Sequence, residues 1–260
     1  MRHPHKWEEL LPEEFFAEME RAPIVYWSCG AMEEHGLHMA LGNDYIQMYE
    51  VCLRAADITG GIVFPPVPFA PAGIPSLSRE ELRSGEHELY PPSLWVSREL
   101  CEWIYTELLE SLADVGFRAC VALGGHYPAD LLLREIEQKT GGRIGDLCFH
   151  GGGTVELLEE EIARLQGEDP AVGGHGGMWE SSLVMAVCPD WADLDRAERV
   201  MDAPFTSQLQ KMSAAGLARI RDASVELGER LLGAAARKAA EHARRLLVRS
   251  LGGKQRGQKS

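Results

Sequence analysis

The sequence predicts an α/β protein in which a mainly parallel sheet carries helices on both faces. β-rich runs alternate with longer amphipathic segments through most of the 260 residues, a pattern typical of βαβ units. The run at 119–123 is apolar throughout, as expected for a strand that is buried on both faces. The last third has helical periodicity, with small or apolar residues recurring every four positions from Leu231 to Leu251.

The individual elements follow from periodicity and from the residues that interrupt it. The expected strands cover 24–29, 61–69, 119–123 and 144–149. The expected helices before the C-terminal one cover 12–21, 44–58, 94–115, 128–139 and 154–166. Pro128 suits the first turn of a helix, whereas Pro65 and Pro66 break the second strand. Two segments without periodicity, 71–93 and 167–177, predict loops, and a loop as long as the first usually covers or serves a site.

The chain has neither an internal repeat nor a domain linker. Its 45% apolar content suffices for a sizeable core. We therefore expect one α/β domain over residues 1–252, followed by a disordered basic tail at 253–260.

Charge and cysteine usage argue against several classes of function. Forty acidic against 26 basic residues give a net charge of −14, which disfavours nucleic acid and anionic membranes as partners. No apolar run reaches the roughly 18 residues of a membrane span, and the N-terminus does not resemble a secretion signal. The six cysteines are scattered without a C-x-x-C pair. They indicate a reducing compartment, so we expect a cytoplasmic protein.

Histidines and carboxylates stand beside glycines at the places where such sheets bind ligands, beyond the carboxyl ends of the strands. Glu33, His35 and Asp44 follow the first expected strand, and His126 follows the run at 119–123. The expected loop at 173–182 carries a further His and Glu. Any one of these residues alone is more often structural, so the interpretation depends on the set.

This set suits a pair of divalent cations. Glu33 and His35 are two residues apart and point the same way in extended backbone. Asp44 would lie at a helix N-terminus, where its carboxylate is favoured and could bridge two ions, and His126 would close the site. Two ions about 3.5–4 Å apart hold a hydroxide and polarise a carbonyl group. Imidazole and carboxylate ligands without thiolate suit Zn, Mn, Fe or Co.

Three motifs resemble those of the creatininase family of metal-dependent amidohydrolases. They are GAMEEHGLH at 30–38 with Asp44 after it, GGH at 124–126, and HGGMWESS at 175–182. Their order and spacing match the family across residues 20–190. The first motif is specific, and the other two support it. The resemblance implies a three-layer α/β/α sandwich, a dinuclear metal centre and a homo-oligomer, often a hexamer.

The resemblance also implies metal ligands. Glu33 and His126 resemble ligands of one ion, His35 resembles a ligand of the other, and Asp44 resembles the bridge. The motifs differ from the family pattern at four positions, and none of these differences removes a ligand. Met39 and Ala40 replace Leu-Pro, Asn43 replaces Thr, and Gly124 replaces Asn.

The remaining carboxylate and the catalytic groups come from the third motif. Creatininase itself has a glutamate two residues after the strand-end histidine, but Pro128 occupies that position here, which argues against creatinine as the substrate. In the wider family the glutamate before the Ser/Thr pair serves instead, and here it is Glu180. His175 resembles the histidine that contacts substrate and acts as a general acid or base, with Glu180 as the second catalytic group. The residues expected to line the substrate pocket are Tyr127, Trp179 and Ser93.

The sequence therefore predicts a metal-dependent hydrolase that acts on a small-molecule substrate. A hydroxide bridging the two ions would attack a small cyclic or linear amide, or a related carbonyl, and the ions would stabilise the oxyanion. One alternative is a hydrolase of keto-inositols, cyclic polyol ketones, within the same family. Another is a non-catalytic sugar- or phosphate-binding protein that uses the glycines at 151–153 to cradle an anion. A third keeps the metal but makes the reaction an isomerisation or an elimination.

Overall fold

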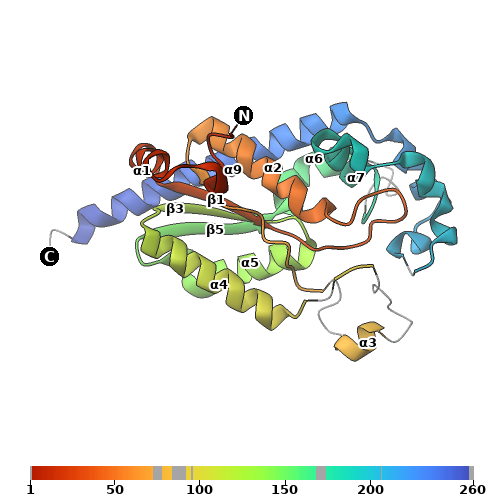
Figure 1. Cartoon of the computed structure of the whole chain (residues 1–260), viewed down its shortest axis with the longest axis horizontal. Helices are drawn as coiled ribbons and strands as arrows, with labels where there is room; N and C mark the ends of the chain where they lie inside the picture. The colour runs from red at the N-terminus through yellow and green to blue at the C-terminus, as the bar shows by residue number, and fades with distance from the viewer. Residues whose placement is uncertain are drawn as a thin grey trace.

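The fold has three layers, with helices on both sides of a central sheet (Figure 1). The computed structural model describes residues 2–72, 78–83, 92–94, 96–167, 174–205 and 207–257. Its five strands are β1 (Ile24–Cys29), β2 (Ile62–Val63), β3 (Ala119–Gly124), β4 (Arg143–Ile144) and β5 (Leu147–Gly153). They lie in the order β2-β1-β3-β5-β4, and all pairs are parallel except β4 with β5. The predicted α/β/α fold with a mainly parallel sheet is confirmed.

The described helices surround this sheet. They are α1 (Pro12–Arg21), α2 (Asn43–Thr59), α3 (Arg79–Arg83), α4 (Arg98–Val115), α5 (Tyr127–Thr140), α6 (Thr154–Gln166), α7 (Met178–Val187), α8 (Ala214–Arg219) and α9 (Val225–Gly257). Short 3-10 turns precede α1 at Trp7–Glu9 and connect α7 to α9 at Pro189–Trp191, Leu194–Asp202, Gln208–Lys211 and Ile220–Asp222. Among the helices of the described segments, none combines the length and the hydropathy required to cross a membrane.

Alternating side chains of each central strand supply two separate cores. In β3, Val121 faces the core formed with α2 and α9, and Ala122 faces the core formed with α4 and α5. Both residues are fully buried, so the strand is apolar on both faces, as the sequence predicted. α6 and α7 pack against α9 on the first side. Gly228 allows the close approach of α9 to α7, because a Cβ atom there would lie 1.9 Å from the carbonyl oxygen of Ser182.

Several element boundaries differ from those expected. The strand expected at 61–69 is only two residues long, because Pro65 and Pro66 offer no N–H to a neighbouring strand. The helix expected at 94–115 begins at Arg98, where the Ser97 hydroxyl caps the N–H of Leu100. Part of the loop expected at 71–93 lies outside the described residues, and the described part includes α3.

The expected strand at 144–149 is two strands joined by a tight turn. Gly145 adopts a φ of 56° there, a left-handed conformation that glycine tolerates. β5 then continues through Gly153, so the three glycines at 151–153 pair with β3 instead of forming a loop. Because residues 151–153 lie within the sheet, they do not form the glycine loop on which the sugar- or phosphate-binding alternative depended.

The element boundaries near residue 178 and at the end of the chain also differ from those expected. α7 begins at Met178, inside the loop expected at 173–182. The loop expected at 167–177 lies partly outside the described residues. α9 extends to Gly257 and therefore includes residues 253–257, for which we expected a disordered tail; residues 258–260 lie outside the described part.

Candidate metal centre

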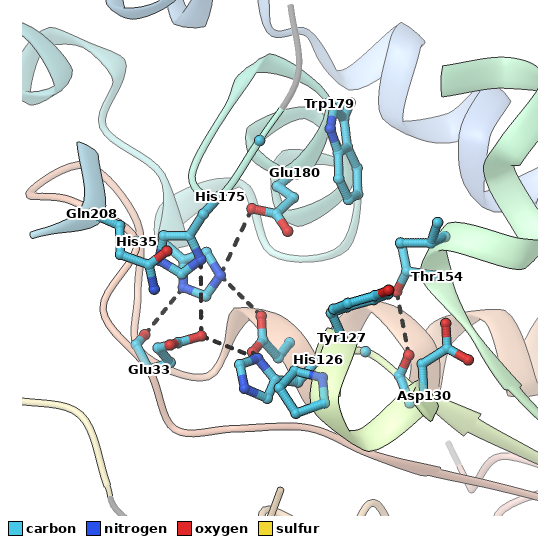
Figure 2. Close-up of a pocket in the computed structure, with 16 residues that line it drawn as sticks. Glu33, His35, His126, Tyr127, Asp130, Thr154, His175, Trp179, Glu180 and Gln208 are labelled. Carbon is cyan, nitrogen blue, oxygen red and sulfur yellow. Dashed lines mark hydrogen bonds and ion pairs between the residues drawn. The ribbon is translucent and has the colours of Figure 1, made fainter. Parts of the chain in front are cut away.

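The candidate site lies where β1 and β3 end and α2, α5 and α7 begin. Glu33 and His35 belong to the segment after β1, and Asp44 lies in the first turn of α2. His126 is the N-cap residue of α5, and Glu180 lies in the first turn of α7. The five predicted ligands therefore converge on one place, three of them at helix N-termini. Figure 2 shows the side chains of Glu33, His35, His126 and Glu180 around a common centre. Helix N-termini favour carboxylates through their exposed N–H groups.

Asp44 connects the two halves of this centre. Its Oδ1 lies 2.9 Å from Nε2 of His35, and its Oδ2 lies 3.1 Å from Nδ1 of His126. The same nitrogen of His126 lies 3.1 Å from Oε2 of Glu33. A single carboxylate thus faces two imidazoles from different parts of the chain. All four side chains are buried, and charged groups at such a place are costly unless they are paired or bind a cation.

Gly125 permits the close approach of β3 to α2 at this point. A Cβ atom on Gly125 would lie 1.7 Å from the backbone oxygen of Asp44. Its N–H donates a hydrogen bond to the backbone oxygen of Cys29, at the end of β1. The next residue is His126. The glycine before the histidine therefore sets the distance between the second motif and the first.

Glu180 and His175 form the other wall of the centre. Oε2 of Glu180 accepts a hydrogen bond from the N–H of Gly176 at 2.6 Å and lies 3.8 Å from Nε2 of His35. The rings of His175 and His35 stack with centroids 4.1 Å apart. Nδ1 of His175 lies 3.9 Å from Oε2 of Glu33. Burial raises the pKa of Glu180, against the opposing effect of the nearby imidazoles.

Opposite charges offset the effect of burial on the other groups. Burial lowers the pKa of His35, but Asp44 and Glu180 raise it more, and it reaches about 10. Glu33 and Asp44 raise the pKa of His126 in the same way. Burial raises the pKa of both Glu33 and Asp44, yet the imidazoles hold these carboxyl pKa values below their usual range. An environment that retains protons on two buried imidazoles also attracts divalent cations.

The residues present fit a dinuclear centre. Oε2 of Glu33 and Oδ2 of Asp44 are buried and accept no hydrogen bond from the part of the chain that the structure describes. Two groups of potential ligand atoms, each within 4.8 Å of one another, share Glu33: one with His35 and His175, the other with Asp44 and His126. Such buried acceptors are normally satisfied, and imidazole with carboxylate is a ligand set for Zn, Mn or Fe.

A match to a protein family agrees with this geometry. The sequence profile of the creatininase family, described as creatinine amidohydrolase, matches residues 8–243. The chain belongs to the creatininase family. It is therefore a metal-dependent amidohydrolase in the broad sense, a hydrolase that acts on amide C–N bonds. The resemblance seen in the three motifs is confirmed.

Two relatives differ in their named activities. The chain is 27% identical over 193 residues to a creatinine amidohydrolase of Pseudomonas putida, covering 70% of this chain and 69% of that protein. It is 24% identical over 219 residues to a mycofactocin precursor peptide peptidase of Mycolicibacterium smegmatis, covering 78% of this chain and 73% of that protein. The two relatives are thus named for different substrates, creatinine and a precursor peptide.

Solved creatininase structures share the fold over nearly the whole chain. A mutant creatininase complexed with creatine has a TM-score of 0.68 at 26% identity, covering 93% of this chain and 98% of that chain. A mutant creatininase of Zn-Zn type has a TM-score of 0.67 at 25% identity, and a Mn creatininase has 0.64 at 25%. Each covers 92% of this chain and 97% of its own.

In this creatininase-family chain the centre opens into a cavity of about 270 Å³. Tyr127 and Trp179 line this cavity, the former exposed and the latter largely buried (Figure 2). Ser93 does not belong to the lining; its hydroxyl accepts a hydrogen bond from the N–H of Glu34 at 2.9 Å. Asp130 and Thr154 add polar groups to the wall.

Two residues near the centre were not among the predicted site residues. Glu34 is buried, and its carboxylate accepts hydrogen bonds from the N–H of Gly36, the hydroxyl of Ser207 and the N–H of Gln208. Gln208 lines the cavity. The carboxylate of Glu34 therefore holds the 207–208 segment against the first motif. The adjacent position in a known motif was a signal for Glu34, but Gln208 lies in a segment with no pattern.

Proposed function

We propose that this protein hydrolyses the C–N bond of a small cyclic or linear amide with the help of two divalent ions, Zn, Mn or Fe. The observation that carries the proposal is the position of Asp44. Its two carboxylate oxygens face His35 and His126 separately, at 2.9 and 3.1 Å. A carboxylate in this position can bridge two cations. The Zn-Zn and Mn forms of similar creatininases support the choice of ions.

The ligands divide into two groups around this bridge. Glu33 and His126 would hold one ion, and His35 and Glu180 the other, with Asp44 common to both. When bound, the ions would polarise the substrate carbonyl and lower the pKa of a water molecule to about 7. The three carboxylates would offset much of the charge of two divalent ions and so leave the centre stable in a buried place.

His175 is positioned to transfer a proton. Its Nε2 lies 2.5 Å from the backbone oxygen of Glu34, which makes Nε2 the hydrogen-bond donor. Nδ1 then carries the lone pair and lies on the Glu33 side of the ring. This nitrogen can accept a proton and return it to the leaving amine, as a general acid–base residue does. Stacking on His35 fixes the plane of the ring.

The cavity favours a small substrate. A volume of about 270 Å³ lies just under the usual range for small-molecule sites. The aromatic rings of Tyr127 and Trp179 offer apolar contact, and Asp130 and Thr154 offer hydrogen bonds. A short amide with one flat face and one polar end suits these walls. A cyclic polyol ketone is the alternative substrate, and a panel of compounds separates the two.

The test combines metal reloading with one ligand variant. The full chain is stripped with a chelator, reloaded with Zn, Mn or Fe, and assayed against lactams, linear amides, formamides and cyclic polyol ketones. Turnover of at least one amide should depend on the added ion. Asp44→Asn should lower turnover by more than about 100-fold. Loss of a residue that only supports a metal ligand typically lowers activity by at most about 100-fold.

The matched control is Asp114→Asn, at an exposed position near the end of α4 that does not line the cavity. It should retain full turnover. If Asp44→Asn also retains turnover and metal, the assignment of the bridge is wrong. Turnover of the ketones alone would favour the alternative substrate class.

A further inference from the structure

A second cluster of ligand-type side chains lies outside the cavity. It consists of His150 on β5, Glu156 on α6 and His242 on α9, whose potential ligand atoms lie within 4.8 Å of one another. Oε2 of Glu156 lies 3.0 Å from Nε2 of His150, and Oε1 lies 3.3 Å from Nε2 of His242. None of the three residues lines the cavity of the dinuclear centre. The tertiary fold brings them together from three separate elements.

A neighbouring carboxylate prepares His150 to be a ligand. Oε2 of Glu137, on α5, lies 3.2 Å from Nδ1 of His150. The same oxygen accepts a hydrogen bond from the N–H of Gly151, which fixes its place. Nδ1 of His150 is therefore a donor, and Nε2 donates to Oε2 of Glu156 at 3.0 Å. Nε2 is the nitrogen that can bind an ion in place of its proton. Histidines that bind metals usually donate their other N–H to a carboxylate or a carbonyl in this way.

The two imidazoles are arranged side by side. Their ring centroids are 3.8 Å apart and their planes differ by 9°. Arg245 donates a hydrogen bond to Nδ1 of His242 at 3.0 Å, so the hydrogen of a neutral His242 ring lies on Nε2 and faces Glu156. Binding an ion at Nε2 therefore requires Arg245 to release Nδ1, which then takes this hydrogen. Two imidazoles and one carboxylate are a common set of protein ligands for zinc, which then leaves a fourth position for water.

The cluster is accessible to an ion from solvent. The side chains of His150, His242 and Glu156 are 14, 17 and 25% exposed. A groove lined by Glu137, His150 and Glu156 opens beside them. Arg134 also borders this groove, and its guanidinium lies 3.9 Å from Glu156, but its main partner is Asp130. The carboxylate of Glu156 thus contacts His150 and His242 closely and Arg134 more distantly.

We propose that His150, Glu156 and His242 form a second metal site, which binds one divalent transition ion of the zinc class separately from the dinuclear centre. The ion would join β5, α6 and α9 and so stabilise the packing of the long C-terminal helix on the sheet. Binding to the folded chain alone raises its stability by mass action. This site goes beyond the proposed hydrolysis, since no group in it touches the cavity.

The competing occupant of the cluster is a proton. Burial lowers the pKa of His150, but Glu137 and Glu156 raise it more, to about 9. A protonated ring between two carboxylates would hold the same elements together without a metal. Counting ions separates these two accounts.

The experiment counts zinc in the full chain. The protein is stripped with a chelator, titrated with Zn²⁺, freed of excess ion and measured by mass spectrometry of the metal. The wild-type chain should hold three ions, and His242→Gln should hold two. His3→Gln, the matched control, alters a histidine that belongs to neither cluster and should hold three. His242→Gln should leave amide hydrolysis unchanged.

A variant of the main centre keeps the two sites distinguishable. Asp44→Asn should lose ions of the dinuclear centre but keep one ion, which the double variant with His242→Gln loses. Zn²⁺ should raise the Tm of Asp44→Asn and leave the Tm of the double variant unchanged. Equal counts in wild-type and His242→Gln protein would overturn the second site. A count that falls with His242→Gln but not with Asp44→Asn would instead overturn the dinuclear centre alone.

Discussion

Charged side chains at the centre are stable only as a set. Asp44 and Glu33 are 1 and 3% exposed, and a buried carboxylate costs several kcal/mol unless a cation or hydrogen bonds compensate it. His35 and His126 supply that compensation within the chain. The sequence motifs identified these four residues because a dinuclear metal centre requires all of them together. They could not show that His35 also stacks on His175, since ring contact depends on how the loop after β1 folds back.

The pH dependence of metal binding follows from the raised imidazole pKa values. His35 has a pKa of about 10 in the metal-free chain, and the pKa of His126 is also raised. Both rings must lose a proton to bind an ion, so protons compete with the metal as the pH falls. Affinity for Zn²⁺ should therefore rise by about tenfold per pH unit for each ring that must lose its proton. Calorimetric titration between pH 6 and 8 measures this slope, and a flat profile would contradict it.

Glu34 is a positioning residue, since its carboxylate joins the first motif to the segment that carries Gln208. Glu34→Ala removes an acceptor from three donors, two of which belong to Ser207 and Gln208. The free energy of unfolding should fall by about 2–4 kcal/mol, and KM should rise more than kcat falls. Urea unfolding and steady-state kinetics measure both effects.

Glu34→Gln is the conservative control for this change. Its amide oxygen still accepts hydrogen bonds, so it should restore part of the stability and of KM. Unchanged KM and stability in Glu34→Ala would show that the 207–208 segment is held by other contacts.

At the scale of elements, the centre depends on how closely α2 approaches β3. Gly125→Ala would place a Cβ atom 1.7 Å from the backbone oxygen of Asp44, so the start of α2 must move. We expect this variant to lose metal and activity together. Gly252→Ala, in α9, meets no atom within 4 Å and should leave metal content unchanged while adding up to about 1 kcal/mol of helix stability. Metal analysis and activity of both variants provide the measurement, and a fully loaded Gly125→Ala protein would contradict this role.

The run of glycines in β5 shows why one element escaped the sequence analysis. Three consecutive glycines at 151–153 indicated a loop, but the structure places them in a strand. A Cβ atom on Gly151 would lie 2.3 Å from the carbonyl oxygen of Leu133, and one on Gly153 would lie 2.3 Å from that of Gly124. The glycines thus serve close packing of β5 against its neighbours. Propensity alone does not separate this role from a turn.

For the whole molecule, alternation of strands and helices was sufficient to predict the layers, because burial on both faces of β3 leaves a continuous apolar run. The part that could not be predicted is the connection from α7 to α9. It consists largely of 3-10 turns and the short helix α8, yet it supplies Gln208 to the cavity. Its place is set by tertiary contacts, such as those of Glu34, and not by local propensity.

Anomalous X-ray diffraction at the metal absorption edge, from crystals of the Zn- or Mn-loaded chain, tests the central claim most directly. Two neighbouring peaks should appear beside Asp44, one on the His35 side and the other on the His126 side. The Asp44→Asn protein should lose this pair of peaks while keeping its fold. Diffraction from loaded crystals with no anomalous peak between Glu33, Asp44 and His126 would contradict the account.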